Sequence, residues 1–199
     1  MLEKEKYGLF FLYMHKQPCC QRGGMGGHMH NIRIETERLL LRPLTVADAE
    51  DMFEWVSDER VARYMVYTTY TEIGQVREWL AFASQDTNKY HFGFQRISDG
   101  KLIGSGNIRP DRKDGSWGFG YNLRHDCWGM GYATEAVRAM MDYARGNFGA
   151  KKFIASHAEP NTASGNVMKK CGLHFMGYGE FQKLDGSCKM RSMVYEGTL

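Results

Sequence analysis

Two glycines one residue apart, Gly129 and Gly131, lead directly into a stretch with helical spacing. Apolar side chains recur from Ala133 at i, i+3, i+4, i+7, i+8 and i+11, the pattern of an amphipathic helix. A helix that begins at a glycine turn presents free backbone N–H groups and the positive end of the helix dipole. Because such a helix start binds phosphate, this segment predicts a site for a phosphorylated ligand.

Two common phosphate-binding motifs do not fit this turn. A P-loop requires Gly-Lys-Ser or Gly-Lys-Thr, and the sequence contains neither. A dinucleotide-binding turn requires a third small residue three positions after the second glycine, where this sequence has Thr134. The Gly-x-Gly pairs at 104–106 and 118–120 lie in strand-like alternation, and we interpret them as strand bends or points of close packing.

The elements that must position this turn alternate between strands and helices. A capping box from Thr45 to Asp48 begins a helix that runs to about Ser57, and a second helix begins near Thr71. Two more helices are predicted at 132–148 and 161–171, and strands at 32–42, 90–97, 101–108, 116–123, 152–158, 173–184 and 187–196. Asp-Gly pairs at 99–100, 114–115 and 185–186 predict hairpin turns. This order predicts a mixed α/β fold: a central, mostly antiparallel, twisted sheet of about six to seven strands, with helices on both faces.

Composition restricts the class of protein. A chain of 199 residues with 43% apolar and 25% charged residues suits one globular domain, and we assign it to 31–199 after a flexible or tag-like lead at 1–30. A net charge of +3, scattered along the chain, argues against nucleic acid as a partner. No apolar run approaches the length of about 18 residues that a membrane span needs. The five cysteines have no metal-ligand spacing, so we expect no metal, free thiols and a cytoplasmic location.

Several segments together resemble the GNAT superfamily of N-acetyltransferases: residues 120–123, the glycine turn at 128–136, and the stretch from Asn161 to Gly172. The opening segment 35–43 is similar to the RimJ/RimL branch, the ribosomal-protein alanine acetyltransferases. The likeness covers roughly 32–196. It implies a GNAT fold and transfer of an acetyl group from acetyl-CoA to a primary amine, either a protein N-terminus or a small-molecule amine. We expect a monomer or a homodimer.

The resemblance also implies roles for particular residues. The strand end before the turn would pair with the pantetheine arm of CoA, and the turn would hold the pyrophosphate. Asn161 would contact the cofactor's amide arm, and Ser164 would reach its thiol end. Ser164 is the first candidate for the acid that protonates the leaving thiolate, and Tyr178 is the second. Helix capping remains an alternative role for Asn161 and Ser164. The residues implied to bind acetyl-CoA are Tyr121, Asn122, Leu123, Gly129, Met130, Gly131, Tyr132, Ala133, Thr134 and Asn161.

The sequence departs from the family at one position that matters. Relatives often carry a glutamate where this chain has Gly118, and that glutamate serves as a base through water. The base is therefore unassigned. His125, His157 and Glu159 lie near the site in sequence, but a structural role is the more ordinary interpretation of each, and proton loss to water remains an alternative. A covalent route through Cys127 lacks a companion base at useful spacing.

The acceptor side is less determined. The linker 64–70 is unusually aromatic, and we leave two interpretations open: a wall around the incoming amine, where cation–π contact helps, or packing under the sheet edge. Two other functions also remain open. One is acyl transfer from a longer acyl-CoA, and the other is a non-catalytic CoA-binding module.

Overall fold

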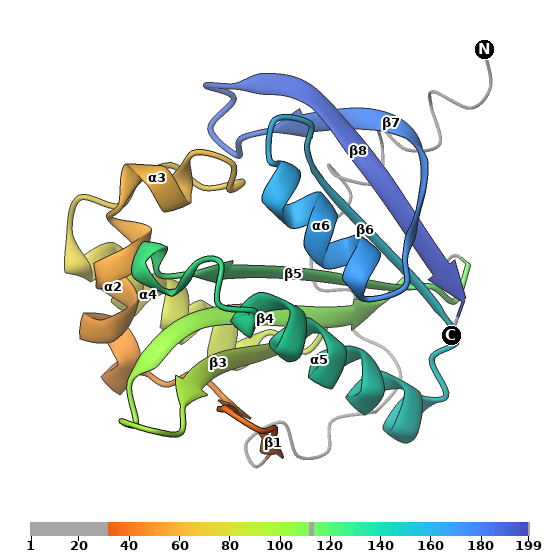
Figure 1. Cartoon of the computed structure of the whole chain (residues 1–199). Helices are drawn as coiled ribbons and strands as arrows, with labels where there is room; N and C mark the ends of the chain where they lie inside the picture. Colours follow the sequence, from red (N-terminus) through yellow and green to blue (C-terminus); the bar gives the residue numbers. More distant parts are fainter. Residues whose placement is uncertain (1–31, 112–113, 199) are drawn as a thin grey trace.

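The computed structural model describes residues 32–111 and 114–198, so the predicted lead at 1–30 lies outside the described residues. The described chain forms a sheet in the order β1-β2-β3-β4-β5-β6-β8-β7 (Figure 1). All neighbouring strands are antiparallel except β5 and β6, which are parallel. The strands are β1 (Ile34–Glu35), β2 (Leu39–Arg42), β3 (Tyr90–Arg96), β4 (Leu102–Pro110), β5 (Trp117–Leu123), β6 (Lys152–Ala158), β7 (His174–Gln182) and β8 (Lys189–Thr198).

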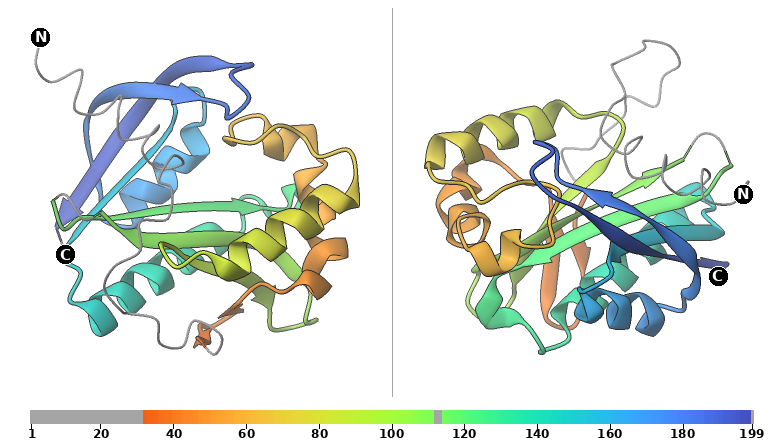
Figure 2. Two further views of the ribbon diagram at one scale, coloured as in Figure 1. Left: turned by 180° about the vertical axis from the view of Figure 1, so that it is seen from behind. Right: turned by 90° about the horizontal axis from the view of Figure 1, so that it is seen from above.

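Helices cover both faces of this sheet, which confirms the predicted fold class (Figure 2). The helices α2 (Ala49–Val56) and α4 (Ile73–Gln85) pack over one face around the buried side chains of Trp55 and Leu80. The helices α5 (Tyr132–Phe148) and α6 (Thr162–Lys170) lie on the other face, over a larger core that includes Phe92, Phe153 and Tyr195. None of the helices in the described part of the chain is long and apolar enough to cross a membrane.

The sheet has eight strands rather than six to seven, because the strand predicted at 32–42 is a hairpin. A turn after Glu35 reverses the chain. The Thr36 N–H donates to the Leu39 carbonyl over 2.8 Å, and the Leu39 N–H donates to the Thr36 hydroxyl over 3.0 Å. Side chains of Ser and Thr favour such turns by bonding to their own backbone, and this local bond outweighs the strand propensity of the flanking residues.

The predicted Asp-Gly turns are confirmed. Gly100, Gly115 and Gly186 all adopt positive φ, between 72° and 76°, which glycine tolerates at little cost. The capping box at Thr45 is also present, because the Thr45 N–H donates to Asp48 Oδ2 over 2.7 Å. It begins a short 3₁₀ turn, η2 (Val46–Asp48), that continues into α2. The sequence analysis did not predict the four-residue helix α3 (Glu59–Ala62), whose Asp58 cap accepts from the Arg60 N–H.

The one parallel pair of strands has a special geometry. Strands β5 and β6 are paired at only two positions, Trp117 with Phe153 and Gly118 with Ile154. Beyond these positions the two strands diverge, and α6 lies beside the opening (Figure 1). On its other side β5 stays paired with β4 as far as Leu123. The far half of β5 therefore presents an edge without a partner strand among the described residues.

Candidate functional site

The open edge of β5 leads straight to the glycine turn. Backbone N–H and C=O groups alternate between the two sides of a strand, so residues 119–123 direct some of theirs toward the opening. An extended chain can pair with such an edge. The predicted pantetheine-binding residues Tyr121, Asn122 and Leu123 all lie on this edge. After them the chain passes through a 3₁₀ turn, η3 (His125–Cys127), and enters the glycine turn.

The glycine turn has the backbone of a phosphate-binding site. Gly129 and Gly131 adopt φ of 77° and 87°, and Gly131 is the N-cap of α5 without any side-chain cap. The first intrahelical bond runs from the Glu135 N–H to the Gly131 carbonyl, so the N–H groups of the preceding helical residues have no partner within the helix. The side chains of Trp128 and Met130 are 46% and 54% exposed. The side chains of the turn are thus exposed to solvent, and the binding of a phosphorylated ligand there stays a prediction.

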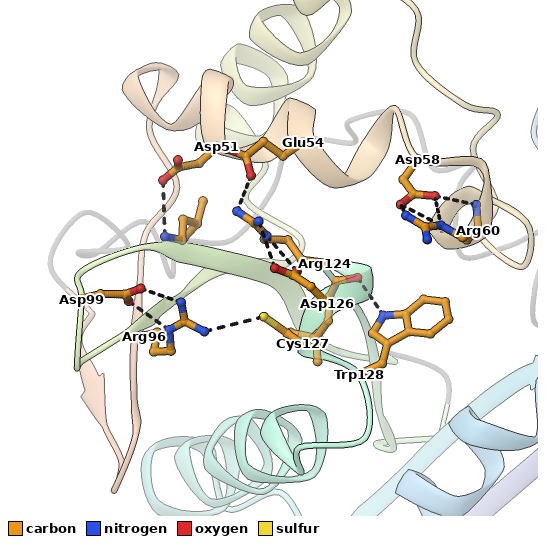
Figure 3. Close-up of polar contacts among 12 residues, drawn as sticks. Asp51, Glu54, Asp58, Arg60, Arg96, Asp99, Arg124, Asp126, Cys127 and Trp128 are labelled. Carbon is orange, nitrogen blue, oxygen red and sulfur yellow. Dashed lines mark hydrogen bonds and ion pairs between the residues drawn. The ribbon is translucent and has the colours of Figure 1, made fainter.

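The start of the turn is fixed to the strand that precedes it. The Trp128 indole Nε1 donates to the Leu123 carbonyl over 3.0 Å (Figure 3). Arg124 forms ion pairs with Asp126 beside it and with Glu54 on α2. Figure 3 shows this arginine between α2 and the turn, so the helices on the opposite face help to fix the loop.

The loop end is held by residues far away in sequence. Arg38, in the β1–β2 turn, donates to the Met130 carbonyl over 2.9 Å and pairs with Glu135 in the first turn of α5 over 2.6 Å. Thr36 donates to the same carboxylate over 2.6 Å. Burial alone would raise the pKa of Glu135, but the hydrogen bonds from Thr36 and Arg38 hold it below its usual range. The sequence analysis missed this cluster, because the partners lie 92 to 99 residues apart.

The structure brings two of the predicted site residues into direct contact. The hydroxyls of Tyr121 on β5 and Ser164 on α6 lie 2.8 Å apart, across the opening between β5 and β6. Burial raises the pKa of Tyr121 to about 12, so its hydroxyl is neutral and can donate at pH 7. Asn161 is the N-cap of α6, and its Oδ1 accepts from the Ser164 N–H over 3.2 Å. The capping role of Asn161 is thereby confirmed, and its contact with the cofactor stays a prediction.

Asn122 links the strand edge to the aromatic linker. Its Oδ1 accepts from the Ser105 hydroxyl over 2.9 Å, and its Nδ2 donates to the Tyr67 hydroxyl over 3.5 Å. Tyr67 and Tyr70 pack edge-to-face and lie against the core under α2 and α4. Both interpretations of the linker therefore find support, since these rings pack on the core and one of them touches the predicted cofactor strand.

The tip of the β7–β8 hairpin holds the same linker. The Lys183 ammonium donates to the carbonyls of Ala62, Met65 and Tyr67 over 2.8, 3.2 and 2.8 Å. The Leu184 N–H donates to the Val66 carbonyl over 2.8 Å. The side chain of one lysine therefore shapes the loop 62–67 from the opposite end of the chain. Spacing in the sequence gives no signal of this contact.

The second acid candidate lies elsewhere. Tyr178 is on β7, which β8 and β6 separate from β5. Its ring contacts Phe175 and lies under the guanidinium of Arg191 at 4.1 Å, and it is 45% exposed. The structure thus brings Ser164 next to Tyr121 rather than next to Tyr178. Arg191 also binds Glu159 through two hydrogen bonds, which lower the pKa of that carboxyl and keep it ionised.

The remaining candidates for base and nucleophile, two histidines and a cysteine, are buried or packed against neighbouring side chains. His157 is buried, its Nδ1–H donates to the Ala158 carbonyl over 2.8 Å, and burial lowers its pKa. Its Nε2 faces Gly165, where even a Cβ atom would approach to 2.7 Å, so an amine has no room there. His125 packs on Trp128 with ring centroids 4.7 Å apart. Cys127 is buried and its pKa is raised by that burial, which disfavours the thiolate a covalent route requires.

The position of the missing glutamate lies at the narrow end of the opening. Among the described residues no group of three or more His, Cys, Asp or Glu side chains is placed to hold a metal ion. Gly118 lies at the last paired position before β5 and β6 diverge, opposite Arg109 on β4. A side chain at this position would begin at the narrow end of the opening, and glycine contributes none.

Comparison with known proteins gives a consistent assignment. The family described as "Acetyltransferase (GNAT) domain" matches residues 38–174. The protein named "Uncharacterized N-acetyltransferase p20" of Bacillus licheniformis is 30% identical over 133 residues, which cover 65% of this chain and 75% of that protein.

Solved structures share the fold at lower identity. The structure of a putative ribosomal-protein-serine acetyltransferase from Vibrio cholerae superposes with a TM-score of 0.75 at 16% identity, covering 85% of this chain and 99% of that chain. The microcin C7 self-immunity acetyltransferase MccE, solved with acetyl-CoA and AMP, superposes with a TM-score of 0.72 at 15% identity, covering 82% of this chain and 94% of that chain.

Proposed function

Because the chain belongs to the GNAT acetyltransferase family, we propose that it transfers the acetyl group of acetyl-CoA to a primary amine by direct attack of the amine on the thioester. One observation carries this proposal. The open edge of β5, the uncapped glycine turn and the Tyr121–Ser164 contact follow one another around the same opening.

These features fit the parts of acetyl-CoA in order. The pyrophosphate binds the backbone N–H groups of residues 129–134 at the start of α5, where the helix dipole favours anions. The pantetheine arm pairs with the open edge at 121–123, since its amides need the donors and acceptors that β6 leaves unused there. Asn161 contacts the same arm from the start of α6. MccE, which shares this fold, was solved with acetyl-CoA, and this supports the assignment of the donor.

The chemistry needs two proton transfers around one acyl transfer. A protein N-terminal ammonium has a pKa of about 8 and an alkyl ammonium one of about 10.4, and either must lose a proton before its nitrogen can attack the thioester carbon. The C–S bond then breaks as the amide C–N bond forms, and the sulfur leaves as a thiolate that takes up a proton. We assign that proton to the Ser164 hydroxyl, which in turn takes a proton from the Tyr121 hydroxyl through their hydrogen bond, and Tyr121 recovers its proton from water. Tyr178 is the weaker candidate.

The proton on the incoming amine goes to water in this proposal. The family glutamate is Gly118 here, His157 is enclosed against Gly165, and Glu159 is paired with Arg191. A protein without a side-chain base loses rate at neutral pH, because only a small fraction of the acceptor is unprotonated. We therefore expect the rate to rise with pH up to the pKa of the acceptor amine.

The acceptor approaches past the linker 64–70, on the side of the opening where Tyr67 contacts Asn122. The Tyr67 hydroxyl accepts a hydrogen bond from Asn122, and Lys183 fixes the linker backbone at the Tyr67 carbonyl. Aromatic faces attract an ammonium group by cation–π contact. The RimJ/RimL-like opening segment favours a protein N-terminus as acceptor, and a small amine is the second possibility. We place the protein in the cytoplasm, where Cys127, Cys171 and Cys188 would stay as free thiols.

A donor-and-acceptor matrix tests this function. The purified chain is mixed with acetyl-, propionyl- or butyryl-CoA and with peptides, polyamines, amino acids or aminoglycosides, and released CoA thiol is measured. The proposal predicts amine-dependent release that is fastest with acetyl-CoA. CoA binding without release on any amine would favour a non-catalytic module, and faster turnover of the longer donors would favour a different acyltransferase.

A further inference from the structure

Arg38 lies outside the opening between β5 and β6, yet its side chain bonds both to the glycine turn and to the first turn of α5. Its Nη1 donates to the Met130 carbonyl over 2.9 Å, and its Nε and Nη2 lie 2.7 and 2.6 Å from Glu135 Oε2. Its backbone N–H donates to Glu135 Oε1 over 2.8 Å, and its guanidinium lies 4.5 Å from the centroid of the Tyr132 ring. These contacts join the β1–β2 turn to the start of α5.

The contact with Met130 fixes the direction of a peptide group. A trans peptide is planar, so the carbonyl of Met130 and the N–H of Gly131 point in opposite directions. Since Arg38 holds the carbonyl toward the β1–β2 hairpin, the Gly131 N–H points away from that hairpin. Figure 1 shows the hairpin below the start of α5 and α6 above it, so the side away from the hairpin is the side of α6.

The contact with Glu135 removes a charge that would oppose phosphate binding. Glu135 lies in the first turn of α5, and the side chain of this ionised carboxylate is only 16% exposed. A carboxylate one turn from a pyrophosphate repels it, and partial burial weakens the screening by water. The pairing of Oε2 with Nε and Nη2 of Arg38 neutralises this charge, while Oε1 ties α5 to Thr36.

We propose that Arg38 is a positioning residue for the donor: it orients the Met130–Gly131 peptide and neutralises Glu135 so that the turn can receive a pyrophosphate. This inference rests on the proposed function, which places the CoA pyrophosphate on residues 129–134. It also gives the segment 35–43, which marked the family branch in the sequence, a physical role at the site.

The test compares Arg38→Gln with the double variant Arg38→Gln/Glu135→Gln and with Arg77→Gln as the matched control. Arg77, on α4 across the sheet from α5 (Figure 2), forms an exposed ion pair with Glu50 over 2.8 Å. CoA affinity is measured by calorimetry, and kcat and KM for acetyl-CoA by thiol release. We expect Arg38→Gln to raise the Kd for CoA and the KM for acetyl-CoA about tenfold and to change kcat by less than about twofold. A tenfold rise in Kd corresponds to the loss of about one charge-assisted hydrogen bond. Arg77→Gln should change neither.

The double variant separates the two parts of the role. Removing the carboxylate as well should restore part of the affinity, since the repulsion disappears, but not all of it, since the peptide is no longer held. Full recovery in the double variant would overturn the orientation of the peptide. Amide hydrogen exchange at 129–133 without ligand should be faster in Arg38→Gln than in the wild type. Unchanged exchange with weaker CoA binding would identify Arg38 as a direct phosphate ligand and overturn the positioning role.

The outcomes also distinguish this inference from the proposed function. If the wild type binds CoA and Arg38→Gln binds it equally well, the role of Arg38 is overturned and the proposed function stands. If the wild type does not bind CoA, both are overturned. A similar fall in melting temperature and in kcat, without a change in KM, would show that Arg38 only stabilises the fold.

Discussion

The replacement of Lys183 by methionine tests how the acceptor side of the site is held. The ammonium donates to three backbone carbonyls, of Ala62, Met65 and Tyr67, and methionine retains the length of the side chain without any donor. A hydrogen bond to a charged group contributes about 1.5–3 kcal/mol. Burial lowers the pKa of Lys183, so desolvation of the ammonium offsets part of this gain, and in the variant water can reach the carbonyls of the half-buried Met65 and Tyr67. We therefore expect a net loss of about 2 kcal/mol rather than the sum over three bonds.

For a domain of this size, about 2 kcal/mol lowers the melting temperature by about 4–8 °C. Urea unfolding gives the free energy directly, and Lys189→Met on the same hairpin is the control, because Lys189 is exposed. The KM for the acceptor should rise several-fold as the linker loosens, and the KM for acetyl-CoA should not change. An unfolding free energy within about 0.5 kcal/mol of the Lys189→Met control would refute the reasoning, since surface substitutions have effects of that size.

Four further predictions follow from individual contacts. Ser164→Ala should lower kcat by about 100-fold, the usual effect of losing a general acid, and should change the KM for acetyl-CoA by less than about threefold. Both parameters are measured by thiol release, and an unchanged kcat would show that Ser164 takes no part in the chemistry. Asn161→Ala should cost about 1 kcal/mol of stability through loss of the cap and should also raise the KM for acetyl-CoA; a KM equal to that of the wild type would leave only the cap. Gly131→Ala should lower the free energy of unfolding by about 1–2 kcal/mol, because a non-glycine residue is strained at this φ. Gly146→Ala within α5 should raise it by about 0.5–1 kcal/mol. Urea unfolding measures both, and equal effects would contradict the strain at Gly131. Burial alone would raise the pKa of Asp48, but Arg42 and Thr45 hold it below its usual range, so the ionised carboxylate stabilises the fold fully above about pH 4 and less as the pH falls below that. Asp48→Asn should therefore flatten the decline of the urea midpoint between about pH 5 and pH 2. An unchanged decline would exclude the Arg42–Asp48 pair as its cause.

Most elements of the fold could be predicted from signals between neighbouring residues in the sequence. The Asp-Gly hairpins, the capping box at Thr45 and the helix that ends at Gly149 are properties of neighbouring residues, and the structure confirms them. The first strand was wrong for a local reason as well. Thr36 turns the chain through its own hydroxyl, and a period-two pattern of apolar residues does not distinguish one strand from two short ones that pair with each other.

The site was predicted only in part, because its contacts span the chain. The glycine turn and the strand end before it are contiguous in sequence, so a motif could locate them. Arg38 holds the turn through a backbone carbonyl 92 residues away, and Lys183 holds the linker at 62–67 through carbonyls 116 to 121 residues away. Backbone carbonyls leave no trace in side-chain spacing, and for this reason spacing predicts neither contact.

The central claim is that CoA binds along the open edge of β5 with its pyrophosphate on the turn at 129–134. Backbone amide chemical shifts of the labelled chain, recorded during titration with CoA and then with pantetheine, test this claim most directly. The account predicts that CoA shifts the amides of residues 129–134 and of 119–123, and that pantetheine, which lacks phosphate, shifts only the second group. The claim would be contradicted if CoA shifted neither group of amides, or if CoA and pantetheine shifted the amides of 129–134 equally.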